Sequence, residues 1–480
     1  MSTQRSHRVL FVAYQFPPVG GVGVHRVTKF VKYLPEFGWQ SSVLTVSNPS
    51  VPLHDDSLLR DIPVGTIIRR AKTLEPGYAL KSAVSGANGG RQSQWSPKKL
   101  IKGLARKAAN TVLQPDSQIL WHRHAYREGI KLLTDTPHDA IIATGPPFSS
   151  LLLGARLSRQ TGLPLILDYR DEWDISNAYW ENKGQGPLSN WIQKRLQQRA
   201  VKQADVVLAT TPSSAAAVGQ VARQANNLVR QHYIYNGFDP DDYAGQGTAS
   251  KQDYGAGTSR FRLSFIGTLW NLNSVAPVVE ALQKLSQKNP QLGAEIELLV
   301  AGRRTDEQNA LLDGLAETPV ALTRLPFVSH QEAVELMQSA DALLMLNSDL
   351  PKAQRIINAK VFEYMAAQRP MFVVAPQGDV WDIVRDLPGT VLCTPGETDG
   401  IAEQLAIQVE QHRLGVRYEE SLWDIDRFHR RSLTGELAQL LEETVTQANL
   451  EQTLSQLTSQ SRKDAPKTQP GISESPGGEK

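Results

Sequence analysis

Short runs of apolar residues alternate with longer segments of helical period along most of the chain. The first run, residues 9–13, is followed by two prolines and predicts a buried parallel strand. Gly20, Gly21 and Gly23 come next, and residues 24–34 then place apolar side chains at helical spacing. We therefore expect a strand, a glycine turn and a helix. Such a turn either brings backbone and helix-start amides close to a phosphate or simply changes the chain direction.

The spacing of these glycines argues against a dinucleotide-binding motif. Arg26 stands where G-x-G-x-x-G would have its last glycine. The second predicted strand, residues 42–46, ends in Ser47 and Asn48 and offers no acid for a ribose. We do not expect NAD binding.

The alternation of strand and helix occurs in two successive series. Further strands are predicted at 139–144, 164–169, 205–210 and 232–235, and after a Gly/Ser/Asp-rich stretch at 261–266, 296–301, 321–325, 342–346 and 371–375. The pattern predicts an α/β protein with two Rossmann-like doubly wound domains that face each other across a cleft. We expect a first domain at 1–235, a linker at 236–259, a second domain at 260–420, C-terminal helices at 421–450 and a disordered tail at 451–480.

Composition and charge narrow the class of protein. A chain of 480 residues is too long for one core, and a net charge of +2 is too small to indicate a nucleic-acid partner. The single cysteine, Cys393, excludes an internal disulfide and a cysteine-based metal site. A chain without disulfides is typical of the reducing cytoplasm, where we expect this protein. No apolar run approaches the roughly 18 residues that span a bilayer, and the run at 9–13 is too short for a signal peptide.

A basic segment at residues 98–107 interrupts the first series. It contains five Lys or Arg residues and no acid, and its apolar residues fall on one helical face. Such a helix either lies on anionic lipid at the inner face of the membrane or packs on the protein with a solvated basic face. Peripheral membrane contact is therefore one expectation.

Polar residues gather where the strand at 164–169 ends. Asp168, Arg170, Asp171, Glu172 and Asp174 lie within seven positions. Open α/β sheets place their chemistry at the carboxyl ends of parallel strands, so this cluster is a candidate site. A cluster of ions that caps a helix is the alternative.

Six motifs in the expected order resemble the retaining glycosyltransferases of family four, which have the GT-B fold. They are FPPVGG at 16–21, TGPPFS at 144–149, DYRDEW at 168–173, NGFD at 236–239, FIGTL at 265–269 and AKVFEYMAA at 359–367. The resemblance extends over about residues 8–445.

The resemblance implies a set of donor-binding residues. Glu363 matches the glutamate that holds the nucleotide ribose, and a carboxylate can accept both hydroxyls of a diol. Lys360 shares a helix face with Glu363 and, with the helix-start amides, would favour the donor diphosphate. Gly20 and Gly21 match the turn that brings amides to that diphosphate, and Gly267 matches a second such turn. An ordinary surface Lys–Glu pair is the alternative.

The chain departs from the family pattern at three places. Arg355 stands eight positions before the ribose-binding glutamate, where the family often has another glutamate, and we expect it to bind phosphate instead. Arg170 occupies the place of a histidine, so Arg170 or Asp171 is expected to act near the anomeric carbon or the acceptor. The basic residues usual after the second glycine turn are missing, and Arg303, or its neighbour Arg304, is the expected substitute.

The resemblance implies transfer of a sugar, with retention, from a nucleotide-diphosphate donor to a carbohydrate or lipid-linked acceptor. Exopolysaccharide, capsule or O-antigen assembly is the expected setting, with no catalytic metal and no other cofactor. Two alternatives stay open at this point. One is a nucleotide-sugar epimerase, and the other is a non-catalytic protein that binds a nucleotide sugar or an assembly partner.

Overall fold

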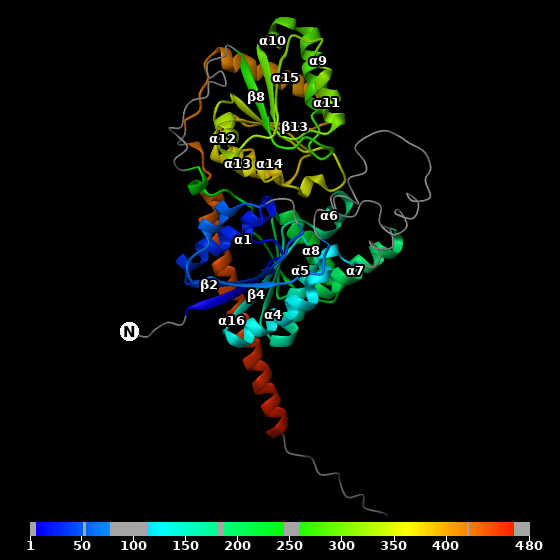
Figure 1. Cartoon of the computed structure of the whole chain (residues 1–480). Helices are drawn as coiled ribbons and strands as arrows, with labels where there is room; N and C mark the ends of the chain where they lie inside the picture. Colours follow the sequence, from blue (N-terminus) through cyan, green and yellow to red (C-terminus); the bar gives the residue numbers. More distant parts are fainter. Residues whose placement is uncertain are drawn as a thin grey trace, which may run out of the picture.

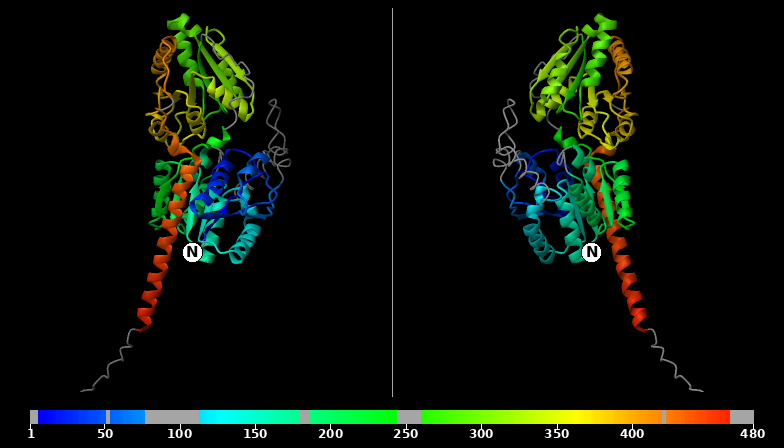
Figure 2. Two further views of the ribbon diagram at one scale, coloured as in Figure 1. Left: turned by 90° about the vertical axis from the view of Figure 1, so that its left-hand side faces the viewer. Right: turned by 90° about the vertical axis from the view of Figure 1, so that its right-hand side faces the viewer.

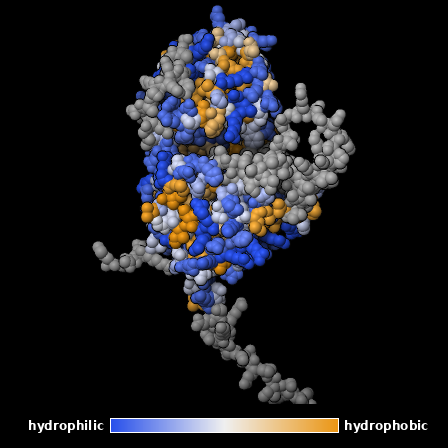
Figure 3. Space-filling view, viewed as in Figure 1, coloured by the Kyte–Doolittle hydropathy of each residue, from blue (hydrophilic) through white to orange (hydrophobic). Residues whose placement is uncertain are grey.

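The computed structural model describes residues 6–50, 54–76, 113–179, 186–243, 260–419 and 422–464. Two α/β domains lie end to end, and a long C-terminal helix runs back along the first of them (Figure 1). The basic segment at 98–107 lies outside the described residues. Hydrophilic and hydrophobic positions are interspersed over the face of both domains that Figure 3 shows.

The first domain is built on a sheet whose seven described strands are all parallel, in the order β3-β2-β1-β4-β5-β6-β7. The strands are β1 His7–Val12, β2 Trp39–Val46, β3 Ile67–Ala71, β4 Ala140–Gly145, β5 Leu165–Tyr169, β6 Val206–Ala209 and β7 Arg230–Tyr233. Because the order reverses between β1 and β4, the loops after these two strands diverge and leave room for a ligand at their carboxyl ends.

Helices cover both faces of this sheet. They are α1 Val22–Tyr33, α4 His122–Asp135, α5 Ser149–Thr161, α6 Trp173–Tyr179, α7 Pro187–Val201 and α8 Pro212–Gln224. Val9 and Phe11 pack with α1 and the C-terminal helix, whereas Leu10 and Val12 pack with α4, α5, α7 and α8. Successive strand side chains point to opposite faces, so a strand covered on both sides is apolar at every position, as the first run predicts.

The second domain repeats this architecture with six described parallel strands, in the order β10-β9-β8-β11-β12-β13. The strands are β8 Phe261–Ile266, β9 Ile296–Ala301, β10 Ala321–Leu325, β11 Ala342–Leu346, β12 Met371–Val374 and β13 Val391–Cys393. Helices α9 Ala276–Lys288, α11 Asp306–Asp313 and α15 Thr398–Arg413 cover one face. Helices α12 His330–Gln338, α13 Lys360–Ala366 and α14 Asp379–Val384 cover the other, and α10 Pro290–Ala294 follows α9. The predicted fold class, two doubly wound α/β domains, is confirmed.

Helix α16, Arg430–Asp464, returns from the second domain to the first (Figure 2). Leu433, Leu437 and Leu441 are buried in the same core as α1. The helix then continues beyond the domain, so the expectation of a disordered tail from residue 451 is wrong as far as Asp464. After residue 443 the sequence has no proline or glycine before Pro466 and is rich in good helix formers, which lets the helix propagate.

No helix of the described part of the chain is long and apolar enough to cross a membrane.

Candidate functional site

The two domains meet through loops at the carboxyl ends of their sheets. The Thr211 hydroxyl, after β6, donates to the backbone oxygen of Arg355, after β11, at 3.3 Å. Ser213 donates to Asp379 at 2.8 Å. We call the region between these loops the interdomain site. It comprises the glycine turn after β1, the loop after β5 and the start of α13.

The glycine turn requires glycine and leaves the start of α1 uncapped. Gly21 has φ +110°, a conformation that side chains disfavour, and no side chain in the described part of the chain caps the helix that follows. Adding a Cβ at Gly20 would bring it within 3.2 Å of Asp55. A hydrogen bond from a neighbouring loop holds the turn in place, since the backbone amide of Asp55 donates to the Pro18 oxygen at 2.8 Å. The Val24 amide donates to the Gly21 oxygen at 3.0 Å, and binding of an anion by the other amides of this turn, expected for Gly20 and Gly21, stays a prediction.

Arg170 joins the two turns at the point where the strand order reverses. Its guanidinium donates to the backbone oxygens of Gly23, after β1, and Pro146, after β4. A Cβ at Gly23 would approach the Arg170 Nη1 atom to 2.8 Å. Asp171 is half-buried beside it, and burial raises the pKa of its carboxyl while the charge of Arg170 lowers it. Arg170 thus positions backbone, and Asp171 is the group of this predicted pair that offers a carboxyl to the site.

Glu172, which the sequence places in the polar cluster but does not single out, lies at the centre of the domain contact. Its buried carboxylate accepts from Ser214 at 2.8 Å and from Nη1 of Arg355 at 2.9 Å. Burial raises the pKa of Glu172 to about 7, against the hydrogen bond from Ser214 and the charge of Arg355. Lys352 and Asp174 form a second ion pair between the domains. In this structure the predicted phosphate ligand Arg355 therefore holds the domains together.

Asp168, from the same cluster, has a structural role. Its carboxylate is fully buried and pairs with Arg26 of α1 at 3.1 Å. The Thr144 hydroxyl donates to it at 2.9 Å, and Arg26 also donates to the backbone oxygen of Ile234 at 2.8 Å. This buried network fastens α1 to the sheet, because an unpaired charge there would be very costly.

The start of α13 faces the first domain. The side chains of Lys360 and Glu363 pair at 2.5 Å and are each about one-quarter to one-third exposed. Tyr364 fixes the helix to the end of β8, because its hydroxyl accepts from the backbone amide of Ile266 at 3.1 Å. Burial lowers the pKa of His25, on α1, and the carboxylate of Glu363 opposes this shift. The charge of Glu363 thus acts electrostatically on the helix that follows the glycine turn, and the joint role of these residues in binding a donor stays a prediction.

The second glycine turn packs against the loop after β9. Gly302 has φ +126°, and a Cβ there would overlap the Gly267 backbone oxygen. The guanidinium of Arg304 is hydrogen-bonded to the backbone, since it donates to the Gly302 oxygen at 2.9 Å and to the Leu325 oxygen at 2.7 Å. Arg303 is exposed and lies over the ring of Phe327, 5.5 Å from its centroid. Of the two expected substitutes, Arg303 is thus the side chain that a ligand can reach.

The described residues contain no group of three or more His, Cys, Asp or Glu side chains that could hold a metal ion.

Two family models match the chain in succession. One, described as a glycosyl transferase 4-like domain, matches residues 20–237, and the other, described as glycosyl transferases group 1, matches residues 260–410. A search of curated proteins gave no match to this sequence.

Solved structures share the fold at low sequence identity. The N-terminal domain of Candida albicans trehalose-6-phosphate phosphatase is 11% identical, with a TM-score of 0.59 over 92% of this chain and 97% of that one. A structure described as trehalose-6-phosphate from E. coli bound with UDP-2-fluoro glucose is 12% identical, with a TM-score of 0.53 over 94% and 98%. An alpha,alpha-trehalose-phosphate synthase (UDP-forming) from Burkholderia vietnamiensis is 12% identical, with a TM-score of 0.50 over 95% and 100%.

The likenesses to solved structures confirm the expected fold, and the two family models confirm the expected class of enzyme. The chain is a glycosyltransferase with the GT-B fold, in which residues 20–237 match the glycosyl transferase 4-like model and residues 260–410 match the glycosyl transferases group 1 model.

Proposed function

We propose that this enzyme transfers a sugar from a nucleotide-diphosphate donor to a carbohydrate or lipid-linked acceptor, with retention at the anomeric carbon. The observation that carries the proposal is the partly exposed Lys360–Glu363 pair at the start of α13, at the end of the second domain that faces the first. A carboxylate suited to a diol and a cation suited to a diphosphate thus lie side by side, and the charge of Glu363 acts on His25 in the other domain. The E. coli neighbour, described as bound with UDP-2-fluoro glucose, supports a nucleotide-sugar donor.

Each group has a defined role in this mechanism. Glu363 accepts the two ribose hydroxyls, and Lys360 lies beside the diphosphate. The amides at Gly20 and Gly21 approach the diphosphate from the first domain. As the bond between the anomeric carbon and the phosphate oxygen breaks, these fixed positive groups stabilise the charge on the leaving diphosphate. The acceptor oxygen bonds to the same face of that carbon and its proton passes to the leaving phosphate oxygen, so the mechanism needs no metal.

The proposed setting is exopolysaccharide, capsule or O-antigen assembly at the inner face of the membrane. The basic segment at 98–107 supports it by composition, since five cations without an acid favour an anionic lipid surface. Reversing the charges of Lys98, Lys99 and Lys102 should weaken sedimentation with anionic vesicles. Unchanged sedimentation would contradict the membrane part of the proposal.

Thermal unfolding with nucleotides tests the donor site. A ligand that binds only the folded state stabilises it by about 2.7 kcal/mol at a hundredfold excess over Kd. We expect UDP, GDP or ADP to stabilise the wild type and not Glu363→Ala. Glu403→Ala, at an exposed position of α15, is the matched control and should respond like the wild type. No response of the wild type to any nucleotide, or an equal response of Glu363→Ala, would refute the site.

A turnover assay then separates transfer from mere binding. Nucleotide release from the donor sugar should rise when acceptor is added, and NMR of the product should show the anomeric configuration of the donor. Release that is independent of every acceptor would contradict transfer, and an inverted product would contradict retention.

A further inference from the structure

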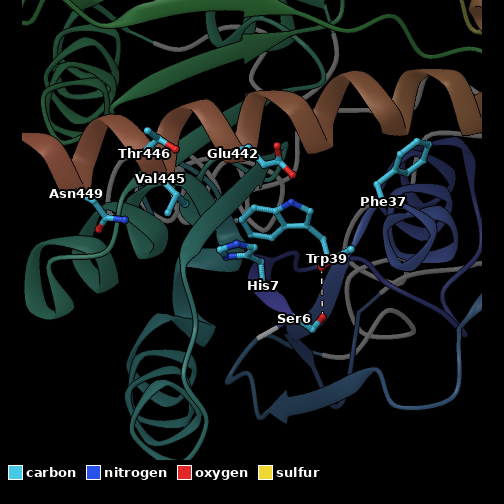
Figure 4. Close-up of a pocket in the computed structure, with 9 residues that line it drawn as sticks. Ser6, His7, Phe37, Trp39, Glu442, Val445, Thr446 and Asn449 are labelled. Carbon is cyan, nitrogen blue, oxygen red and sulfur yellow. Dashed lines mark hydrogen bonds between the residues drawn. The ribbon is translucent and has the colours of Figure 1, made fainter. Parts of the chain in front are cut away.

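A second pocket lies on the first domain, at the edge of the sheet opposite the interdomain site. It has a volume of about 560 Å³ and lies between α16 and the starts of β1 and β2 (Figure 4). The glycine turn follows the other end of β1, and a strand of six residues extends about 20 Å. The pocket is therefore separate from the donor site, and its volume is in the range of small-molecule sites, about 300–1,000 Å³.

Its lining suits a neutral ligand that is rich in hydroxyl groups. No lysine or arginine is among the described residues that line it, and Glu442 would repel a phosphate. Ser6, Thr446 and Asn449 add hydroxyl and amide groups that can both donate and accept hydrogen bonds. The His7 ring stacks on Trp39 with 5.0 Å between centroids, which adds a flat aromatic surface. Sugars combine hydroxyl groups with an apolar face, and this lining offers partners for both.

An unpaired donor inside the pocket wall points to the same ligand. The indole of Trp39 is fully buried, and its Nε1–H has no hydrogen-bond partner among the described residues. Buried polar groups are nearly always paired, so an orphaned donor requires an explanation. Figure 4 shows the nitrogen edge of Trp39 directed toward α16, with the Glu442 side chain close to it. The Glu442 side chain is exposed, so it can shift aside and admit a hydroxyl that accepts from Nε1 and donates to the carboxylate.

We propose that this pocket binds a neutral saccharide unit. A hydroxyl of the sugar pairs with both Trp39 and Glu442, and its ring lies against the aromatic surface of His7. The proposal rests on the proposed function in one respect, the origin of the sugar. The unit belongs to a saccharide acceptor and is not the unit that receives the new sugar, so the pocket retains the acceptor while the interdomain site acts.

NMR of the full-length ¹⁵N-labelled protein tests the pocket. The probes are the methyl glycosides of glucose, galactose, mannose and N-acetylglucosamine, with UDP as a probe of the donor site. We expect at least one glycoside to shift the indole N–H resonance of Trp39 saturably, and UDP to leave it unchanged. The resonance is assigned by its loss in Trp39→Phe. Saturation transfer from the protein to the glycoside protons gives a second readout that does not need this assignment.

Two variants of neighbouring residues decide the outcome. Glu442→Ala should weaken glycoside binding about tenfold or more, the effect of losing one hydrogen bond to a charged group. Glu443→Ala is the matched control, because Glu443 pairs with Arg230 at 3.1 Å and does not line the pocket. No saturable shift with any glycoside, or equal affinities in the two variants, would overturn the proposal.

Glu363→Ala keeps the two proposals distinguishable. It removes the proposed ribose contact and should leave glycoside binding at Trp39 unchanged. Glycoside binding that Glu363→Ala abolishes would place the sugar in the interdomain site and refute the second pocket. Glycoside binding without any nucleotide response would instead refute the donor site alone.

Discussion

Glu172→Gln tests how burial at the domain contact affects stability. The side chain keeps its shape but can no longer ionise. In the folded chain, burial raises the pKa of Glu172 to about 7, whereas the ordinary value is 4.5. Between these two pH values the folded chain binds more protons than the unfolded chain. The free energy of unfolding of the wild type therefore falls as pH rises from 4.5 to 7 and is level above that, as far as this group is concerned.

The size of this effect follows from the two pKa values. Each pKa unit corresponds to about 1.4 kcal/mol, so ionised Glu172 costs the folded state roughly 3 kcal/mol above pH 7. Arg355 is 26% exposed and remains hydrated when its partner is neutral. We therefore expect Glu172→Gln to match the wild type near pH 4.5 and to be more stable by roughly 3 kcal/mol above pH 7, although the ion pair is lost.

Urea unfolding of both proteins across this pH range is the assay. The difference in unfolding free energy at each pH is the informative quantity, because contributions from all other groups cancel. Glu403→Gln, exposed on α15, is the control and should follow the wild type at every pH. Parallel curves for the wild type and Glu172→Gln, or a variant less stable above pH 7, would refute the reasoning.

Three further substitutions test the groups that shape the interdomain site. Gly302→Ala should cost about 1–3 kcal/mol in urea unfolding, because its φ is +126° and the Cβ overlaps the facing turn, whereas Gly396→Ala, in open space, should cost little. Arg26→Ala leaves buried Asp168 unpaired and should cost roughly 3–5 kcal/mol; a loss below about 1 kcal/mol would contradict a buried pair. Arg170→Lys keeps the positive charge but loses the guanidinium that donates to two backbone oxygens at once. The KM of this variant for the donor should therefore rise nearly as much as that of Arg170→Ala. Full activity of the lysine variant would show that charge alone matters.

Much of the site follows from sequence because it depends on local backbone chemistry. Gly20 and Gly21 precede a helix that no described side chain caps, and Lys360 and Glu363 are three residues apart on one helix. Spacing along a single element decides such features, so the pattern alone predicts them. The apolar run of β1 likewise predicts a strand covered on both faces.

Partners that are distant in the sequence follow no such rule. Asp168 and Glu172 belong to one polar run, yet Asp168 pairs with Arg26 beneath α1 and Glu172 pairs with Arg355 of the other domain. Arg170 resembles a catalytic cation in the sequence but donates to two backbone oxygens. The choice of partner depends on which loops the folded sheets bring together. The type of a residue does not reveal which distant residue will lie beside it.

Periodicity and turn chemistry act over a few residues, so the pattern of the chain was enough to predict the two doubly wound domains, the glycine turns and the Lys–Glu pair. No such pattern predicts that α16 returns to the first domain, that Arg355 joins the two domains, or that the Trp39 N–H beside a pocket lacks a partner among the described residues. These features arise where elements far apart in the chain pack together. Their energies come from burial and charge pairing, which exist only once the chain has folded.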